Sequence, residues 1–114
     1  MAYSKREINQ ITGQFIKELK RDFKVDKVIL FGSYAYGRPQ RRSDIDIAVI
    51  SPDFTHLNDY ERIKLLLAVA HRIKTREPID FETLGYSPSE YQKAGYYDIP
   101  LGEIKEKGKI VYSA

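Results

Sequence analysis

The chain has 114 residues, of which 42% are hydrophobic and 31% are charged, and it contains no cysteine. This length predicts one domain over residues 1–114, large enough to bury one hydrophobic core. The composition excludes intrinsic disorder, and the lack of cysteine excludes disulfides, thiolate catalysis and thiolate zinc sites. No apolar run approaches the ~18 residues of a membrane span, so we expect a cytoplasmic protein without a membrane partner.

The net charge is +3, from 19 basic and 16 acidic side chains, and Arg38, Arg41 and Arg42 form the densest basic segment. Such a mild excess is compatible with nucleotides, nucleic acid or an acidic partner. No helix-turn-helix, RNP-like or zinc-finger pattern accompanies it. We therefore expect no nucleic-acid partner.

The first third of the chain predicts a helix, a strand and a loop. A capping box at Ser4, followed by apolar residues every three or four positions, predicts a helix over residues 4–23. The apolar run of residues 28–31 is typical of a buried strand. Residues 32–42 are rich in Gly, Ser, Pro and Arg, which predicts a loop whose only helix is short and begins near Ser33.

The middle of the chain predicts a second strand and a long helix. Residues 44–50 alternate and are rich in β-branched side chains, which indicates a strand. A second helix of roughly five turns follows and ends before Pro78. Its predicted core face consists of Leu57, Tyr60, Ile63, Leu66, Leu67, Ala70 and Ile73.

The last third predicts a third strand over residues 79–84 and a third helix that opens with a capping box at Ser87. A final helical turn near Ile104 precedes a possible edge strand over residues 109–112. The order of these elements predicts an α/β fold, with a mixed sheet of about four strands packed against helices.

Asp44 and Asp46 are the first candidate site residues. Residues two apart on a strand share a face, with Cα atoms about 6.5–7 Å apart. Two carboxylates at this separation repel each other unless a cation lies between them. Because carboxylate oxygens are hard ligands, we expect Mg²⁺ or Mn²⁺ rather than zinc.

A third carboxylate is available on the third predicted strand. Asp80 and Glu82 flank Phe81 and therefore point the same way. If this strand lies beside the strand of Asp44 and Asp46, either residue completes a site of three acids. Such a site can hold two cations for an in-line displacement at phosphorus.

The segment before the aspartates offers groups that bind phosphate. Gly32 allows a close approach of the backbone, and the amides of Ser33 and Tyr34 at a helix N-terminus can bind phosphate oxygens. Arg38 and Arg42 can add positive charge at a triphosphate or at an incoming acceptor.

Two segments, Leu30–Gly37 (LFGSYAYG) and Ser43–Val49 (SDIDIAV), resemble the signature of the nucleotidyltransferase superfamily, G-S followed by D-x-D. The ten-residue gap between the two motifs is similar to that of the minimal nucleotidyltransferases, or MNT domains. The resemblance is specific from about Val28 to Val49 and continues weakly around Asp80.

The resemblance implies the small nucleotidyltransferase fold and a role for each matching residue. Gly32 and Ser33 would contact the nucleotide phosphates, and Asp44 and Asp46 would bind the metals. Asp80 would be the third acid and metal ligand, acting on the attacking hydroxyl, with Glu82 as the alternative.

The implied activity is a metal-dependent transfer of AMP from ATP to a hydroxyl, with two Mg²⁺ ions as the expected cofactors. Larger relatives append a helical domain that holds the acceptor, so we expect the acceptor here to come from a second chain. Minimal domains of this type are usually encoded beside a helical HEPN toxin. The MNT half is the antitoxin, and in some pairs it adenylylates a tyrosine of the toxin.

Two alternatives stay open at this point. Relatives often carry Arg where this chain has Tyr36, which favours an antitoxin that neutralises its partner by binding alone. A nucleotidyltransferase that modifies a small molecule, such as an aminoglycoside, is the other alternative.

Overall fold

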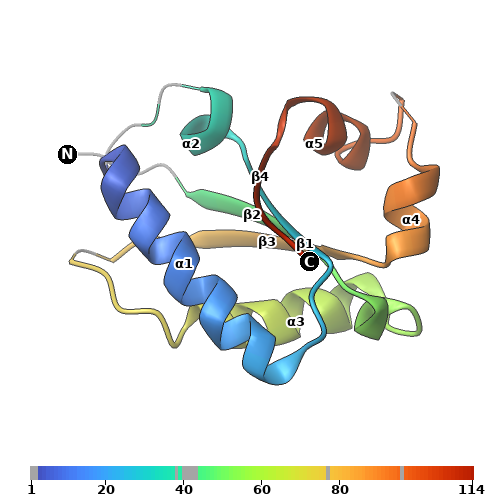
Figure 1. Ribbon diagram of the computed structural model, residues 1–114, viewed down its shortest axis with the longest axis horizontal. Helices are drawn as coiled ribbons and strands as arrows, with labels where there is room; N and C mark the ends of the chain where they lie inside the picture. Colours follow the sequence, from blue (N-terminus) through green and yellow to red (C-terminus); the bar gives the residue numbers. More distant parts are fainter. Residues whose placement is uncertain (1–2, 38, 40–43, 77, 96) are drawn as a thin grey trace.

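A mixed β-sheet with helices on both faces organises the chain (Figure 1). The computed structural model describes residues 3–37, 39, 44–76, 78–95 and 97–114. In chain order its elements are α1 (Lys5–Asp22), β1 (Lys27–Phe31), α2 (Ser33–Tyr36), β2 (Ile45–Ile50), η1 (Pro52–Phe54), α3 (Asp59–Ala70), β3 (Phe81–Tyr86), α4 (Pro88–Lys93), α5 (Leu101–Lys107) and β4 (Lys109–Ser113). None of the helices in these segments has both the length and the apolar character needed to cross a membrane.

The sheet has the strand order β3-β2-β1-β4. β1 pairs antiparallel with both β2 and β4, whereas β2 and β3 are parallel and are connected through α3. The predicted mixed sheet of about four strands, with the last strand at an edge, is therefore confirmed.

Side chains alternate along β2 between two cores. Ile45, Ile47 and Val49 face a core that α1 and α3 complete. Ala48 and Ile50 face the opposite side, where α4 and α5 cover the sheet (Figure 1). Burial on both faces explains why the strand is apolar at nearly every position after Asp46.

The predicted helix starts are confirmed, because both capping boxes form. Ser4 accepts from the amide of Glu7, and the Glu7 side chain returns to the Ser4 amide. Ser87 and Glu90 make the same pair of bonds at the start of α4.

The second long helix and the third strand differ from their predicted bounds. α3 spans 12 residues and ends at Ala70, well before Pro78. The amides of Arg72 and Ile73 bond to carbonyls three residues back, which tightens and closes the last turn. β3 begins at Phe81 and continues to Tyr86, because its parallel pairing with β2 extends to Ile50.

The predicted core face of α3 is partly wrong. Leu66 and Ala70 are buried as expected, but Tyr60 is 66% exposed, and the buried side of the helix also contains Arg62. A charged side chain at a core position rotates the buried face away from the one that hydrophobicity alone predicts.

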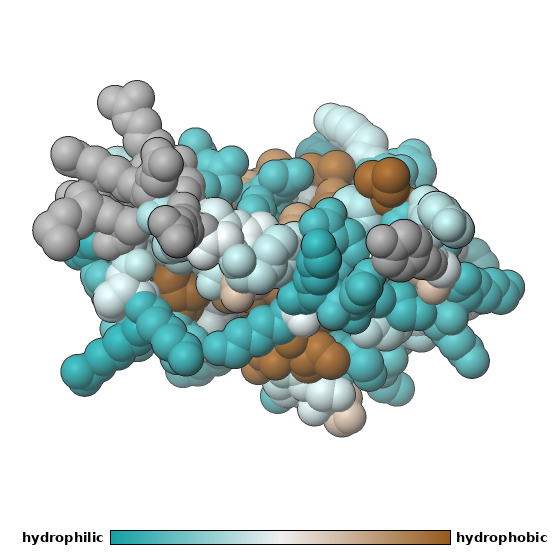
Figure 2. All heavy atoms as spheres, turned by 90° about the horizontal axis from the view of Figure 1, so that it is seen from above, coloured by the Kyte–Doolittle hydropathy of each residue, from teal (hydrophilic) through white to brown (hydrophobic). Residues whose placement is uncertain are grey.

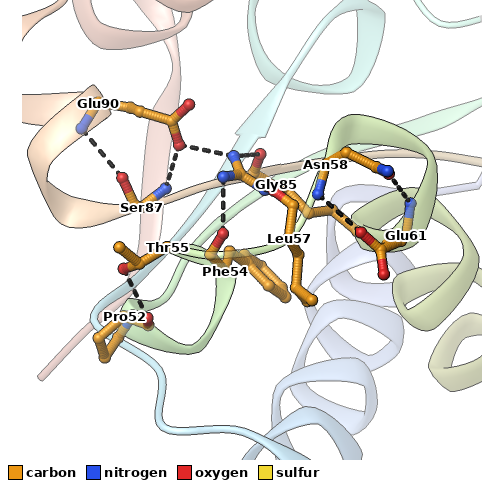
Figure 3. Close-up of polar contacts among 10 residues, drawn as sticks. Pro52, Phe54, Thr55, Leu57, Asn58, Glu61, Gly85, Ser87 and Glu90 are labelled. Atoms are coloured by element: carbon orange, nitrogen blue, oxygen red, sulfur yellow. Dashed lines mark hydrogen bonds and ion pairs between the residues drawn. The ribbon is translucent and has the colours of Figure 1, made fainter.

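Arg62 is only 5% exposed and is the centre of a set of polar contacts, which we call the Arg62 hub. Figure 3 labels its partners Phe54, Leu57, Gly85 and Glu90. Arg62 Nε donates to the carbonyl of Leu57 at 2.9 Å, and Arg62 Nη2 donates to the carbonyl of Phe54 at 2.7 Å. Nη1 donates to the carbonyl of Gly85 on β3 at 3.1 Å. One guanidinium therefore satisfies three carbonyls around the loop before α3 and the end of β3.

The same guanidinium also connects to α4. Arg62 Nη1 lies 2.6 Å from Glu90 Oε1, the oxygen that also accepts from the Ser87 amide. Gly85 makes this arrangement possible, because a Cβ at this position would lie 2.9 Å from the Phe54 ring and 3.1 Å from Arg62 Cβ.

We predict that Arg62→Leu lowers the free energy of unfolding by roughly 3–5 kcal/mol, since it leaves buried carbonyls without donors and Glu90 without its cation. Chemical denaturation followed by circular dichroism measures this loss. The matched control is Arg21→Ala, because the Arg21 side chain is 70% exposed and its pair with Glu18 contributes about 0.5 kcal/mol or less. Equal stability of the two variants would contradict the role given to Arg62.

Candidate active site

The candidate site lies where β1 ends and where β2 and β3 begin. Phe31, the last residue of β1, is paired with Asp46 on β2. Asp46 in turn lies beside Glu82 on β3. The chain leaves β1 through Gly32 into the short helix α2, so the G-S and D-x-D motifs meet at one edge of the sheet.

Three carboxylates converge at this edge. Asp44, Asp46 and Glu82 each offer one oxygen, and these oxygens all lie within 4.8 Å of one another. Asp46 is half-buried, whereas Asp44 and Glu82 are exposed. Glu82 follows the same alternation as Leu84 and Tyr86, which places the cluster on the sheet face covered farther along by α4 and α5.

Asp80 is not a member of this group among the described residues. Its backbone carbonyl accepts from the amide of Ile45 at 2.9 Å, just before the first paired residues of β2 and β3. Asp80 is exposed and also lines a hollow beside the end of α3. Of the two candidates for a third acid, the structure therefore brings Glu82, and not Asp80, to the aspartates.

The environment of Asp46 disfavours its charged form. Partial burial raises the pKa of the Asp46 carboxyl to about 7, and a hydrogen bond and like charge from Glu82 and the charge of Asp44 add to the effect. A group of carboxylates that repel one another is stabilised when a cation neutralises them.

The donor set fits a hard divalent cation. Carboxylate oxygens are the ligands that Mg²⁺ and Mn²⁺ prefer, and two of the three groups remain exposed to an incoming phosphate. Asp44, Asp46 and Glu82 are therefore the residues that would hold such ions.

Gly32 is required by two independent constraints. Its φ of 71° and ψ of −156° lie in a region that is essentially restricted to glycine. A Cβ at this position would overlap Asp46 Oδ2 and lie 2.8 Å from Asp46 Cγ. The backbone therefore passes directly against the central carboxylate, and a side chain here would displace it.

The predicted short helix at Ser33 is confirmed as α2. The amides of Ala35 and Tyr36 return to the Gly32 carbonyl, so the amides of Ser33 and Tyr34 precede the first intrahelical bonds. The Tyr34 side chain turns toward the core, where its hydroxyl accepts from the Tyr3 amide at 3.2 Å. The Tyr34 ring therefore packs against the core beside Tyr3.

Tyr36 connects α2 to the C-terminal helix. Its hydroxyl donates to Glu103 Oε1 on α5 at 3.4 Å. Nothing in the sequence pattern predicts this contact, because the two residues are 67 positions apart. Arg38, Arg41 and Arg42 lie outside the described residues, so the predicted roles of Arg38 and Arg42 stay predictions.

Residues 13–96 match the sequence model of the nucleotidyltransferase domain. The chain belongs to this family. The resemblance carried by G-S and D-x-D is thereby confirmed, and the chain is a nucleotidyltransferase.

Curated relatives of this nucleotidyltransferase come from Methanocaldococcus jannaschii. The protein named "Putative protein adenylyltransferase MJ1215" is 45% identical over 60 residues, which are 47% of this chain and 70% of the relative. The protein of the same description named MJ0141 is 33% identical over 86 residues, covering 70% of this chain and 79% of the relative.

Solved structures share the fold. A crystal structure described as a putative nucleotidyltransferase from Sulfolobus solfataricus superposes with a TM-score of 0.68 at 15% identity, over 96% of this chain and 83% of that one. A toxin–antitoxin structure with AMP-PNP superposes with a TM-score of 0.58 at 23% identity, over 90% of this chain and 73% of that one.

We predict that Gly32→Ala destabilises the nucleotidyltransferase by roughly 1–3 kcal/mol, because alanine can neither adopt this backbone conformation nor fit beside Asp46. Thermal unfolding measures the loss. Gly13→Ala is the matched control, since a Cβ at Gly13 in α1 meets nothing within 4 Å and alanine favours the helix. A Gly32→Ala protein as stable as the Gly13→Ala protein would contradict the close approach.

The raised pKa of the Asp46 carboxyl makes the free energy of unfolding depend on pH. Its pKa rises from 3.8 to about 7 in the folded state, so between these values the native protein holds a proton that the unfolded chain lacks. The free energy of unfolding therefore falls as pH rises from about 4 to about 7. Without screening, this pKa shift corresponds to a change of about 4 kcal/mol in the free energy of unfolding. Because Asp46 is partly exposed and screened by solvent, we expect a change of roughly 1–2 kcal/mol.

Asp46→Asn should remove this slope, so that the variant is more stable than the metal-free wild type at pH 8 and equal to it near pH 4. Mg²⁺ at pH 8 should raise the melting temperature of the wild type more than that of Asp46→Asn. If the free energy of unfolding depends on pH in the same way in both proteins, the pKa of Asp46 is not raised in the folded state.

Proposed function

We propose that this chain transfers AMP from ATP to a hydroxyl of a partner protein and releases pyrophosphate, with two Mg²⁺ ions, or Mn²⁺, as cofactors. The observation that carries the proposal is the convergence of Asp44, Asp46 and Glu82 beside the close approach of Gly32. Three acids at the start of neighbouring strands are the donor set of a phosphoryl-transfer site.

The acids and the backbone around Gly32 divide the tasks of this reaction between them. The bound cations would neutralise the phosphate charge and favour the attacking hydroxyl. Asp44, Asp46 and Glu82 would hold these cations, and the Gly32 backbone with the Ser33 and Tyr34 amides would position the phosphates. As the acceptor oxygen bonds to the α-phosphorus, the bond from that phosphorus to the departing pyrophosphate breaks, and the hydroxyl proton passes to the Glu82 carboxylate.

The acceptor that we propose is a tyrosine of a helical HEPN-type toxin, which makes this chain the antitoxin of the pair, acting in the cytoplasm. Two lines support a protein acceptor. The M. jannaschii relatives are named as protein adenylyltransferases, and a toxin–antitoxin structure with AMP-PNP shares the fold.

One observation favours a second candidate, an antitoxin that acts by binding alone. Tyr36 stands where related signatures carry Arg, and its hydroxyl engages Glu103 instead of adding a cation near the phosphates. A tyrosine in place of this arginine would weaken the binding of the triphosphate.

The deciding experiment is transfer of radiolabelled AMP from ATP with Mg²⁺, with and without the product of the neighbouring gene. We predict labelling of the partner by the wild type and none by Asp44→Ala/Asp46→Ala. No labelling, with equally tight partner binding by both proteins, would establish the binding antitoxin. Labelling of an added aminoglycoside in the absence of the partner would instead identify a small-molecule enzyme.

The same assay ranks the two candidate third acids. Glu82→Gln should lower the rate of AMP transfer by at least about 100-fold, because it removes a ligand and the proton acceptor. Asp80→Asn should change the rate by only a few-fold. If Asp80→Asn lowers the rate of AMP transfer more than Glu82→Gln does, Asp80 is the third acid.

A further inference from the structure

Tyr36 and Glu103 connect two elements that border the candidate active site. The Tyr36 hydroxyl on α2 donates to Glu103 Oε1 on α5 at 3.4 Å, and both side chains are exposed. Figure 1 shows α2 and α5 on the same side of the sheet. The distance is long for a hydrogen bond between two oxygens, so the hydroxyl can exchange Glu103 for another charged acceptor.

Tyr36 lies one helical turn from the point where the backbone touches the carboxylate cluster. The Tyr36 amide donates to the Gly32 carbonyl at 3.2 Å, and a Cβ at Gly32 would overlap Asp46 Oδ2. One helical turn rises about 5.4 Å. A triphosphate whose α-phosphorus lies at the cluster extends outward over a similar distance, so its β- and γ-phosphates can reach the Tyr36 hydroxyl.

Glu103 belongs to the face of the sheet that carries the carboxylates. Its neighbour Ile104 packs in the same core as Ile50, which follows Asp46 in the alternation of β2. Phe31, the residue paired with Asp46 on β1, packs in this core too. Helix α5 therefore covers the side of the sheet toward which Asp46 points.

The negative charge of Glu103 is not neutralised within the part of the chain that the structure describes. Glu103 forms no ion pair there. Lys105, two positions farther along α5, is turned to α4, where its Nζ donates to the Ala94 carbonyl at 3.1 Å and lies over the Tyr91 ring. Glu103 therefore adds a negative charge to a face that already carries three carboxylates, and this charge repels incoming phosphates.

The surface around α2 and α5 suits a charged ligand. It is mostly hydrophilic, and its apolar side chains lie in separate patches (Figure 2). Polar contacts and charge, rather than apolar contact, therefore decide how tightly a ligand binds on this face.

We infer that Glu103 is a positioning residue that lowers the affinity of the site for the pyrophosphate part of the nucleotide. While Glu103 accepts from Tyr36, the hydroxyl is not available to the β- and γ-phosphates, and the charge of Glu103 opposes them. Without Glu103, the Tyr36 hydroxyl donates to these phosphates, whose charged oxygens are strong acceptors. This inference rests on the nucleotide site of the proposed function and adds a residue that lies outside both sequence motifs.

The test measures the binding of α,β-methylene ATP, an analogue that cannot undergo the transfer, to the full chain with Mg²⁺. Glu103→Gln removes the charge but keeps an oxygen that accepts from Tyr36, whereas Glu103→Ala removes both. Tyr36→Phe is made alone and together with Glu103→Ala. Glu106→Ala is the matched control, because Glu106 is also exposed on α5 and, among the described residues, makes no hydrogen bond to α2.

We expect Glu103→Ala to lower the dissociation constant of the analogue about tenfold at low salt, and Glu103→Gln about threefold. High salt should remove the effect of Glu103→Gln, because mobile ions screen a charge. Tyr36→Phe should change the dissociation constant by less than about twofold in the wild type and raise it about threefold in Glu103→Ala, where the hydroxyl is free to bind phosphate. Glu106→Ala should stay within about twofold of the wild type.

Inorganic pyrophosphate and AMP locate the effect along the nucleotide. Glu103→Ala should tighten the binding of pyrophosphate as it does that of the analogue, and it should leave the binding of AMP unchanged. A gain in affinity for AMP alone would overturn the placement of Glu103 beside the departing pyrophosphate.

Two further results would overturn the inference. One is a Glu103→Ala protein, with the melting temperature of the wild type, that binds the analogue no more tightly. The other is an equal effect of Tyr36→Phe with and without Glu103, because the hydroxyl is then not held by this residue.

The inference and the proposed function fail in different ways. The expected dissociation constants in a protein that transfers no AMP to its partner would overturn the transfer alone. Transfer of AMP by a protein whose affinity for the analogue does not depend on Glu103 would overturn the inference alone.

Discussion

Mutual repulsion of three carboxylates is the constraint on which the site depends. Asp44, Asp46 and Glu82 hold oxygens within 4.8 Å of one another, so their charges repel unless Asp46 keeps its proton or a cation binds. The apolar side chains that follow Asp46 on β2 are buried in two cores and fix the strand in place. Burial of β2 on both faces of the sheet thus keeps the three acidic side chains close together although their charges repel.

The candidate site and the contacts that anchor β3 lie at opposite ends of this strand. Glu82 is near the start of the strand, whereas Gly85 near its end receives the Arg62 guanidinium. The Arg62 hub holds the loop before α3, the end of β3 and the start of α4 through hydrogen bonds that do not involve the carboxylates. The strand can therefore be anchored at one end and remain open to ligands at the other.

Local patterns in the sequence predicted most of the fold, and long-range register accounts for what they missed. Capping boxes, alternating strands and the G-S and D-x-D motifs depend on neighbours in sequence, so they can be recognised directly. The choice between Asp80 and Glu82 depends on how β3 aligns with β2, which no local pattern specifies. The same is true of Arg62, whose burial requires carbonyls from the loop before α3 and from the end of β3, and of the contact between Tyr36 and Glu103.

The parallel pairing of β2 with β3 has a consequence for the order in which the site is assembled. β1 and β2 are antiparallel neighbours in the chain and carry both recognisable motifs, but a parallel strand can join them only after a crossover. Glu82 therefore reaches the aspartates only when the crossover through α3 brings β3 beside β2. Because Asp46 and Glu82 are brought together by the pairing of β2 with β3, a chain in which β3 has not joined the sheet contains both motifs but not the cluster of three carboxylates.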